Sequence, residues 1–110
     1  MPRGIMVVQS RPVSAEREGE YNDWYVNTHI PEILAIPGFV AVRRYKLPGP
    51  DAVYLAICDI EADDLTAPAK ELRARSAAGR NTPSDAIQLD PPPVVTIYEE
   101  FGGSSERPAS

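Results

Sequence analysis

The sequence lacks the features that would set it apart from an ordinary globular domain. Its only cysteine, Cys58, cannot form a disulfide within the chain. No apolar run approaches the roughly 18 residues that a membrane span requires, and residues 1–12 lack the apolar core and cleavage site of a signal peptide. We therefore expect no membrane association and a cytoplasmic location.

Basic residues are also scarce. The chain has 11 Lys and Arg against 16 Asp and Glu, which gives a net charge of −5 at pH 7. Nucleic-acid-binding proteins concentrate Lys and Arg on one face. The short runs RRY at 43–45 and RAR at 73–75 do not reverse the acidic balance, so no nucleic-acid partner is expected.

Metal ligands are few. Transition-metal sites need three or four clustered ligands, whereas this chain has one histidine, His29, and one cysteine. The PGPD segment at 48–51 and the glycine pair at 102–103 are not phosphate-cradling loops. We expect no metal and no cofactor.

What is present is enough chain for one hydrophobic core, since 110 residues is a common domain size. Hydrophobic periodicity predicts strands at 4–10, 39–47, 52–61 and 94–101, and helices at 17–29 and 63–79. Pro68 indicates that the second helix proper starts near Ala67. This β-α-β-β-α-β order is that of a ferredoxin-like α+β sandwich, with two helices covering one face of a four-stranded sheet. We assign residues 1–101 to this single domain and predict that 102–110 form a disordered tail.

Proline interrupts the first helix. Pro31 lacks a backbone donor and disfavours the helical conformation at Ile30, so we expect the helix to break near His29. A second short turn, PEILAI, should follow. The Pro37-Gly38 pair then turns the chain into the next strand.

Both faces of the sheet are expected to be apolar. Within residues 52–60, one face carries Val53, Leu55 and Ile57, and the other carries Tyr54, Ala56, Cys58 and Ile60. A sheet with one face in water alternates apolar and polar side chains instead. We therefore expect a homodimer in which the uncovered sheet faces pack together.

The first helix concentrates aromatic and titratable side chains. Tyr21, Tyr25 and His29 are four residues apart and form one stripe, joined by Trp24 and Thr28. This stripe should face the sheet, and the polar residues of the helix are assigned to solvent: Glu16, Arg17, Glu18, Glu20, Asp23 and Asn27. One interpretation is that the stripe is only core packing.

The alternative interpretation is a catalytic site. Imidazole is the side chain best suited to move a proton near pH 7, and an apolar cleft would favour the neutral, basic form of His29. Tyr45 and Tyr54 on the paired strands, with Arg43 or Arg44, are candidates to orient a substrate oxygen or stabilise an enolate or phenolate.

The segment YNDWYVNTHIPEILAIPGFVAVRRY, residues 21–45, resembles the helix and second strand of EthD-like proteins in the dimeric α/β-barrel superfamily. In these proteins an aromatic-Trp-x4-His-x-Pro segment precedes a Pro-Gly-Phe turn into a strand. The resemblance rests on Trp24, His29, Pro31, Pro37, Gly38 and Tyr45. It implies a dimer of ferredoxin-like subunits, each with a cleft between helices and sheet and the histidine at the cleft wall.

The superfamily has several activities, among them lactone isomerases, polyketide cyclases, cofactor-free monooxygenases and haem-dependent enzymes. Some members are stress-response proteins without known activity. A single histidine excludes a two-histidine relay within one subunit, and haem ligation by His29 has no second histidine or cysteine-rich element to support it.

We hypothesise a cofactor-independent enzyme, of lyase, isomerase or cyclase type, that acts on a small apolar carbonyl, phenolic or lactone substrate. The reaction would be proton transfer next to a carbonyl, with His29 as base or acid and Tyr45 or Tyr54 bonded to the oxyanion. The residues assigned to substrate binding are Tyr21, Trp24, Tyr25, Thr28, Phe39, Arg43 and Arg44. Two alternatives are a cofactor-free monooxygenase and a non-catalytic dimer that binds a hydrophobic metabolite. Whether residues 80–93 form a lid is left open.

Overall fold

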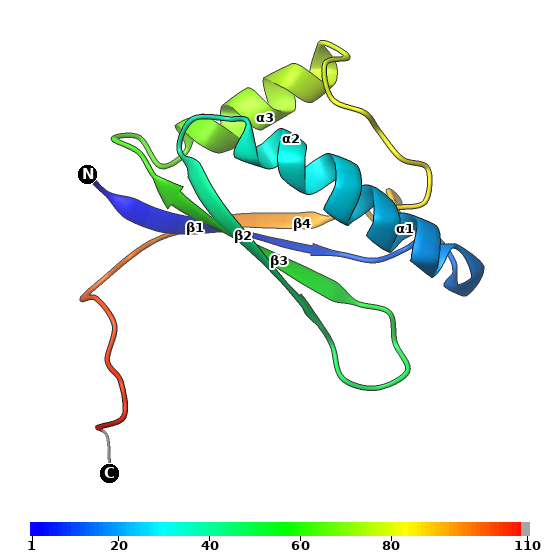
Figure 1. The fold of residues 1–110 in the computed structure, drawn as a ribbon, viewed down its shortest axis with the longest axis horizontal. Coiled ribbons are helices and arrows are strands. Elements are labelled where there is room, and N and C mark those ends of the chain that lie inside the picture. The colour runs from blue at the N-terminus through cyan, green and yellow to red at the C-terminus, as the bar shows by residue number, and fades with distance from the viewer. Residues whose placement is uncertain (109–110) are drawn as a thin grey trace.

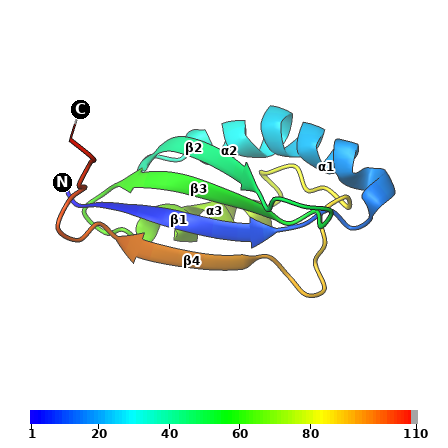
Figure 2. The same cartoon turned by 90° about the horizontal axis from the view of Figure 1, so that it is seen from below.

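The computed structural model describes residues 1–108 and has the predicted order of elements. The strands are β1 Arg3–Ser10, β2 Phe39–Lys46, β3 Tyr54–Glu61 and β4 Val94–Glu99. They form one antiparallel sheet in the order β2-β3-β1-β4 (Figure 1). The helices α1 Glu18–Trp24, α2 Ile30–Leu34 and α3 Ala67–Ala77 all cover the same face of the sheet (Figure 2). The predicted ferredoxin-like α+β fold class is thereby confirmed.

Pro31 does not break the first helix, and this part of the sequence prediction was wrong. The chain passes from α1 through a π-helical segment, Tyr25–His29, directly into α2. The N–H of Ile30 donates to the carbonyl of Tyr25, five residues back, and Ile30 keeps helical dihedrals of φ −61° and ψ −47°. A proline ring collides with the carbonyl four residues back in a regular α-helix. The wider π turn immediately before Pro31 accommodates the ring and carries His29.

A β-bulge in β2 changes which of its side chains face the helices. The pairing of β2 with β3 shifts between Phe39 and Ala41, which leaves Val40 as the extra residue. Phe39 and Arg44 therefore share the helix-facing side although they are five residues apart, and Lys46 follows Arg44 on that side. The bulge thus turns Arg44 and Lys46, rather than Arg43 and Tyr45, toward the helices.

The core between helices and sheet has two parts. We call the first the aliphatic cluster, with the buried residues Met6, Ile33, Ile36, Phe39, Cys58, Ile60 and Ala69. The second contains the buried residues Tyr21, Tyr25, Tyr54, Ala56 and Ala86, with Trp24 packed against it. The aliphatic part lies under α2 and the start of α3, and the tyrosine-rich part lies under α1.

The turn into β2 fixes α3 against the end of α2. Gly38 has a positive φ of +105°, and a Cβ atom added there would lie 2.6 Å from Cγ of Pro68 at the start of α3. Any other residue would be strained in this conformation and would displace α3. The glycine of the Pro-Gly turn is therefore required for the close approach of this turn to the start of α3.

Residues 102–108 contain no helix or strand and extend away from the sheet (Figure 1). They belong to the segment predicted to be a disordered tail, whose last two residues, 109 and 110, lie outside the described residues. Within residues 1–108, no helix is long and apolar enough to cross a membrane.

Candidate functional site

The tyrosine-rich part of the core contains most of the predicted site residues. We call Tyr21, Trp24, Tyr25, His29, Arg44 and Tyr54 the aromatic cluster. The first four come from the continuous helix and the last two from β2 and β3. The structure therefore brings together six of the ten predicted site residues under α1 and the π-helical segment.

His29 is enclosed by aromatic rings. Its ring stacks on the indole of Trp24, with centroids 4.6 Å apart and an interplanar angle of 14°. Tyr25 meets it edge-on at 4.9 Å. Burial lowers the pKa of His29 to about 4, with Glu32 raising it and Arg44 lowering it. The imidazole is therefore neutral at pH 7 and has a free nitrogen lone pair to accept a proton.

Arg44 carries a positive charge into the cluster. Its guanidinium carbon lies 4.2 Å from the ring centroid of Tyr25, 4.9 Å from that of Tyr54 and 5.5 Å from that of Tyr21. One Nη donates to Oδ1 of Asn22 at 3.0 Å, whereas Nε is buried and has no hydrogen-bond partner among residues 1–108. No carboxylate of those residues forms an ion pair with Arg44. The guanidinium is held by π faces, so it can still attract an anion.

A polar network closes the cluster on the side of the β2–β3 hairpin. The Tyr54 hydroxyl donates to Glu18 and accepts from Nδ2 of Asn22 at 3.1 Å. Lys46 lies 3.3 Å from the same carboxylate of Glu18. The hydrogen bond from Tyr54 and the contact with Lys46 lower the pKa of Glu18. The assignment of Glu18 to solvent was therefore wrong, because its carboxylate is engaged with two strands of the sheet.

The remaining tyrosines stay protonated. The hydroxyls of Tyr21 and Ser10 lie 2.6 Å apart in a buried hydrogen bond. Burial raises the pKa of Tyr21 and raises that of Tyr25 strongly. Neither phenol can act as a base near neutral pH, so His29 is the one group of the aromatic cluster suited to that role.

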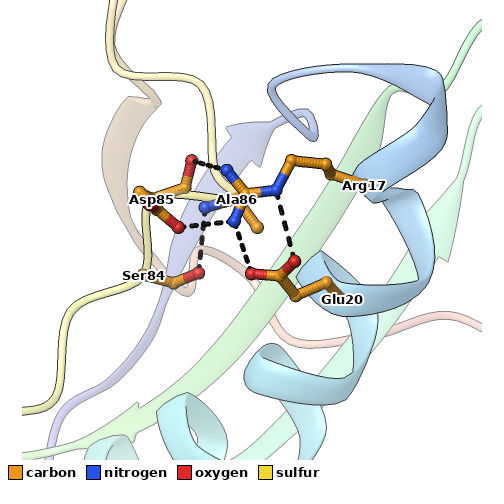
Figure 3. Close-up of polar contacts among 5 residues, drawn as sticks. All are labelled: Arg17, Glu20, Ser84, Asp85 and Ala86. Atoms are coloured by element: carbon orange, nitrogen blue, oxygen red, sulfur yellow. Dashed lines mark hydrogen bonds and ion pairs between the residues drawn. The ribbon is translucent and has the colours of Figure 1, made fainter.

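The segment of residues 80–93 covers the aromatic cluster from the α1 side. The carbonyl of Thr82 accepts from Nε1 of Trp24 at 2.9 Å, and the buried Ala86 packs against the tyrosines. Arg17 pairs with Asp85 at 2.5 Å and also with Glu20, as Figure 3 shows. Arg17 was assigned to solvent, but it fastens this segment to the first helix. These contacts fasten residues 82–86 to the first helix and to the aromatic cluster.

Four predicted site residues lie elsewhere. Tyr45 and Arg43 are on the sheet face that the helices leave uncovered: Tyr45 is 51% exposed, and Arg43 pairs with Asp59 at 2.7 Å. Phe39 belongs to the aliphatic cluster. Thr28 is half-buried on the π-helical segment, and its side chain forms no hydrogen bond to any of residues 1–108. The structure does not bring Tyr45 or Arg43 near His29.

Two of the hollows at the surface of residues 1–108 are well formed, and His29 lines neither of them. One, of about 420 Å³, is bordered by Ile5, Val40 and Tyr98 on the uncovered sheet face. The other, of about 520 Å³, lies at the hairpin end of the sheet and reaches Tyr54 and Lys46. The second hollow therefore touches the polar side of the aromatic cluster. The expected cleft with the histidine at its wall does not match either hollow, since His29 is absent from the lining of both.

Asn22, Glu18 and Lys46 were not predicted as site residues. A signal for them was present, because Glu18 and Asn22 are four residues apart on the flank of the aromatic stripe. Lys46 shares the face of Arg44 only once the register of β2 is known. Within residues 1–108, no group of three His, Cys, Asp or Glu side chains is arranged to hold a metal ion.

Comparison with known proteins gives similarity in fold. No protein-family model matches the chain, and no curated protein sequence matches it significantly. A proposed monooxygenase from Shewanella loihica PV-4 aligns with a TM-score of 0.61 at 12% identity, covering 94% of this chain and 99% of the other. SnoaB, a cofactor-independent oxygenase from Streptomyces nogalater, aligns with a TM-score of 0.60 at 13% identity, covering 96% and 97%.

An ethyl tert-butyl ether degradation (EthD) family protein from Bacillus halodurans C-125 aligns with a TM-score of 0.52 at 15% identity, covering 92% of this chain and all of the other. EthD-like proteins are the group that residues 21–45 resemble in sequence. The structural neighbours therefore agree with that resemblance and share the fold of the chain.

Proposed function

We propose that the protein is a cofactor-independent enzyme of the EthD-like type that removes a proton from a small, largely apolar carbonyl, phenolic or lactone substrate. The observation that carries this proposal is the juxtaposition of a neutral imidazole and an unpaired guanidinium inside one aromatic cluster. A purely structural core gains little from either group, since both cost desolvation.

The two groups have complementary roles in this reaction. His29 accepts the proton from the C–H or O–H bond, and the bonding electron pair remains on the substrate as an enolate or phenolate. Arg44 stabilises that oxyanion with its unused donors, and the Tyr54 hydroxyl beside it becomes a second donor when its proton turns from Glu18 to the substrate oxygen. Tyr21, Trp24 and Tyr25 form the apolar wall, which excludes water from the intermediate.

The test is turnover of a panel of phenols, lactones and 1,3-dicarbonyl compounds by purified protein treated with a chelator. Tyr54→Phe removes the hydroxyl in the aromatic cluster, and we expect turnover to fall at least about tenfold. Tyr45→Phe is the matched control, because it removes the same hydroxyl from the opposite face of the sheet, and it should leave turnover unchanged. Equal losses in both variants, or turnover that the chelator abolishes, would contradict the proposal.

A second candidate function is a cofactor-free monooxygenase. Two of the solved structures with this fold are described as oxygenases or monooxygenases, and one of these as cofactor-independent. The same deprotonation by His29 would then give a carbanion that reacts with O₂. Oxygen consumption measured with an electrode during turnover distinguishes this reaction from isomerisation or cyclisation, which consume none.

We further propose that the uncovered sheet face binds a second copy of the chain. That face carries Ile5, Val7, Tyr45, Leu55, Ile57 and Tyr98. Light scattering should give twice the 12.0 kDa mass of one chain. Ile57→Glu should reduce the mass to that of one chain, whereas Val26→Glu, on the exposed side of the first helix, should not. A single-chain mass for the unmodified protein would exclude the dimer.

A further inference from the structure

Glu32 is a half-buried residue with one buried carboxylate oxygen, and the reaction described above does not use it. It lies in α2, three residues after His29 and therefore on the adjoining turn of the same continuous helix. Its Oε2 accepts the N–H of Thr82 at 2.8 Å, whereas its Oε1 is buried with no hydrogen-bond partner among residues 1–108. A buried carboxylate oxygen without a partner costs stability, so its retention requires an explanation.

The peptide groups flanking Thr82 connect Glu32 to the ring on which His29 stacks. The backbone N–H of Thr82 donates to Glu32, and the backbone carbonyl of Thr82 accepts from the indole of Trp24 at 2.9 Å. Trp24 in turn stacks on His29 at 4.6 Å. The carboxylate, the indole and the imidazole are thus fixed relative to one another by one residue of the covering segment.

A nearby carboxylate would offset the charge that forms when His29 is protonated. When the imidazole accepts a proton, a second cation forms beside Arg44 in a site lined by aromatic rings. The charged groups that act on His29 are Glu32 from α2 and Arg44 from β2, with opposite effects. Glu18, the other carboxylate near the aromatic cluster, is already engaged with Tyr54 and Lys46. Glu32 is the carboxylate left to balance the imidazolium.

We propose that Glu32 is a positioning residue for His29, whose unpartnered oxygen stabilises the imidazolium formed when the substrate proton is transferred. This inference rests on the proposed function of His29 as a base. The proton moves from substrate to imidazole, the electron pair stays on the substrate, and the carboxylate supplies only its charge and an acceptor oxygen.

The competing explanation is that Glu32 only anchors the covering segment through Thr82. Glu32→Gln separates the two roles, because the amide oxygen can still accept the N–H of Thr82 while the charge is lost. Glu16→Gln is the matched control: it removes the same charge from an exposed residue near the start of the first helix.

The experiment is an NMR titration of the single imidazole in both variants and in the unmodified protein. The proposal expects the midpoint of His29 to fall by about 1 pH unit in Glu32→Gln and to stay unchanged in Glu16→Gln. Glu32→Asp, which keeps the charge but withdraws it by one methylene, should give an intermediate midpoint. The emission of Trp24, the only tryptophan, should be the same in Glu32→Gln and unmodified protein, because the bond to Thr82 is retained.

A midpoint in Glu32→Gln equal to that in Glu16→Gln would overturn the inference. An unchanged His29 midpoint in Glu32→Gln together with a shift in Trp24 emission would also overturn it, because this result is expected if Glu32 only anchors Thr82. With a substrate in hand, Glu32→Gln should lower kcat more than it raises KM. Turnover that survives His29→Asn would instead overturn the proposed function. The NMR titration requires no turnover, so it distinguishes a failure of the Glu32 proposal from a failure of the proposed function.

Discussion

The two halves of the core lie on the same face of the same sheet and differ in chemistry. The aliphatic cluster has only apolar side chains and one thiol, and burial raises the pKa of that thiol, Cys58, to about 11. The aromatic cluster holds hydroxyls, a guanidinium and an imidazole. A stable fold needs only the first kind of packing, so the proposed function is assigned to the polar groups of the second kind. The comparison predicts that substitutions in one half reduce stability and that those in the other reduce activity.

The largest expected effect is on turnover. His29→Asn removes the base from the aromatic cluster and should lower kcat by roughly 10² to 10⁴-fold while the far-UV circular dichroism stays unchanged. Steady-state kinetics on any substrate of the panel measures it. Full activity in this variant would show that the imidazole only packs.

The next effect is on stability and belongs to the aliphatic cluster. Ile33 is 1% exposed, and Ile33→Ala removes three methyl or methylene carbons from tightly packed surroundings. The free energy of unfolding, measured with urea, should fall by about 2–5 kcal/mol. Turnover per folded molecule should change far less than in His29→Asn. A loss of activity without a loss of stability in Ile33→Ala would contradict the proposed difference between the aliphatic and aromatic clusters.

A smaller effect is the dependence of stability on pH. The folded-state pKa of His29, about 4, lies below its ordinary value of 6.5, so between these pH values the unfolded chain binds the additional proton. The free energy of unfolding therefore rises with pH across this window, and up to about 3 kcal/mol is lost as the pH falls from 6.5 to 4. Urea titrations of the unmodified protein and His29→Asn isolate this contribution, since other groups titrate in both. Parallel curves would mean that the imidazole is solvated.

The smallest effect concerns one hydrogen bond. Tyr21→Phe removes the hydroxyl that bonds to the buried Ser10, at an expected cost of about 1 kcal/mol. A double-mutant cycle with Ser10→Ala measures the coupling between the two hydroxyls. Additive losses would show that the bond contributes nothing to this half of the core.

The order of elements could be read from the sequence because periodicity and turn residues agree along the chain. The start of α3 near Ala67 and the hairpin at 48–51 follow from local signals of this kind. Pro31 misled the prediction, since its local effect is to end a helix and the π turn that accommodates it has no sequence signature in a single chain.

The site was less predictable because it depends on register and on distant contacts. Regular alternation counted from Phe39 would place Tyr45 on the helix-facing side of β2. The extra residue at Val40 exchanges the two sides of the strand beyond it, so Arg44 and Lys46 face the helices instead. Glu18 looked like a solvent-exposed charge because its partners, Tyr54 among them, lie on strands far along the chain. Local patterns do not encode such contacts.

The central claim is that chemistry takes place in the aromatic cluster and not at the surface hollows. A crystal structure of the protein with a substrate or product from the panel tests it most directly. The account predicts a reacting atom about 3 Å from an imidazole nitrogen of His29, with the substrate oxygen facing Arg44 and residues 80–93 displaced or reclosed over it. A ligand seated on the uncovered sheet face beside Tyr45 or Tyr98, with the surroundings of His29 unchanged, would contradict it.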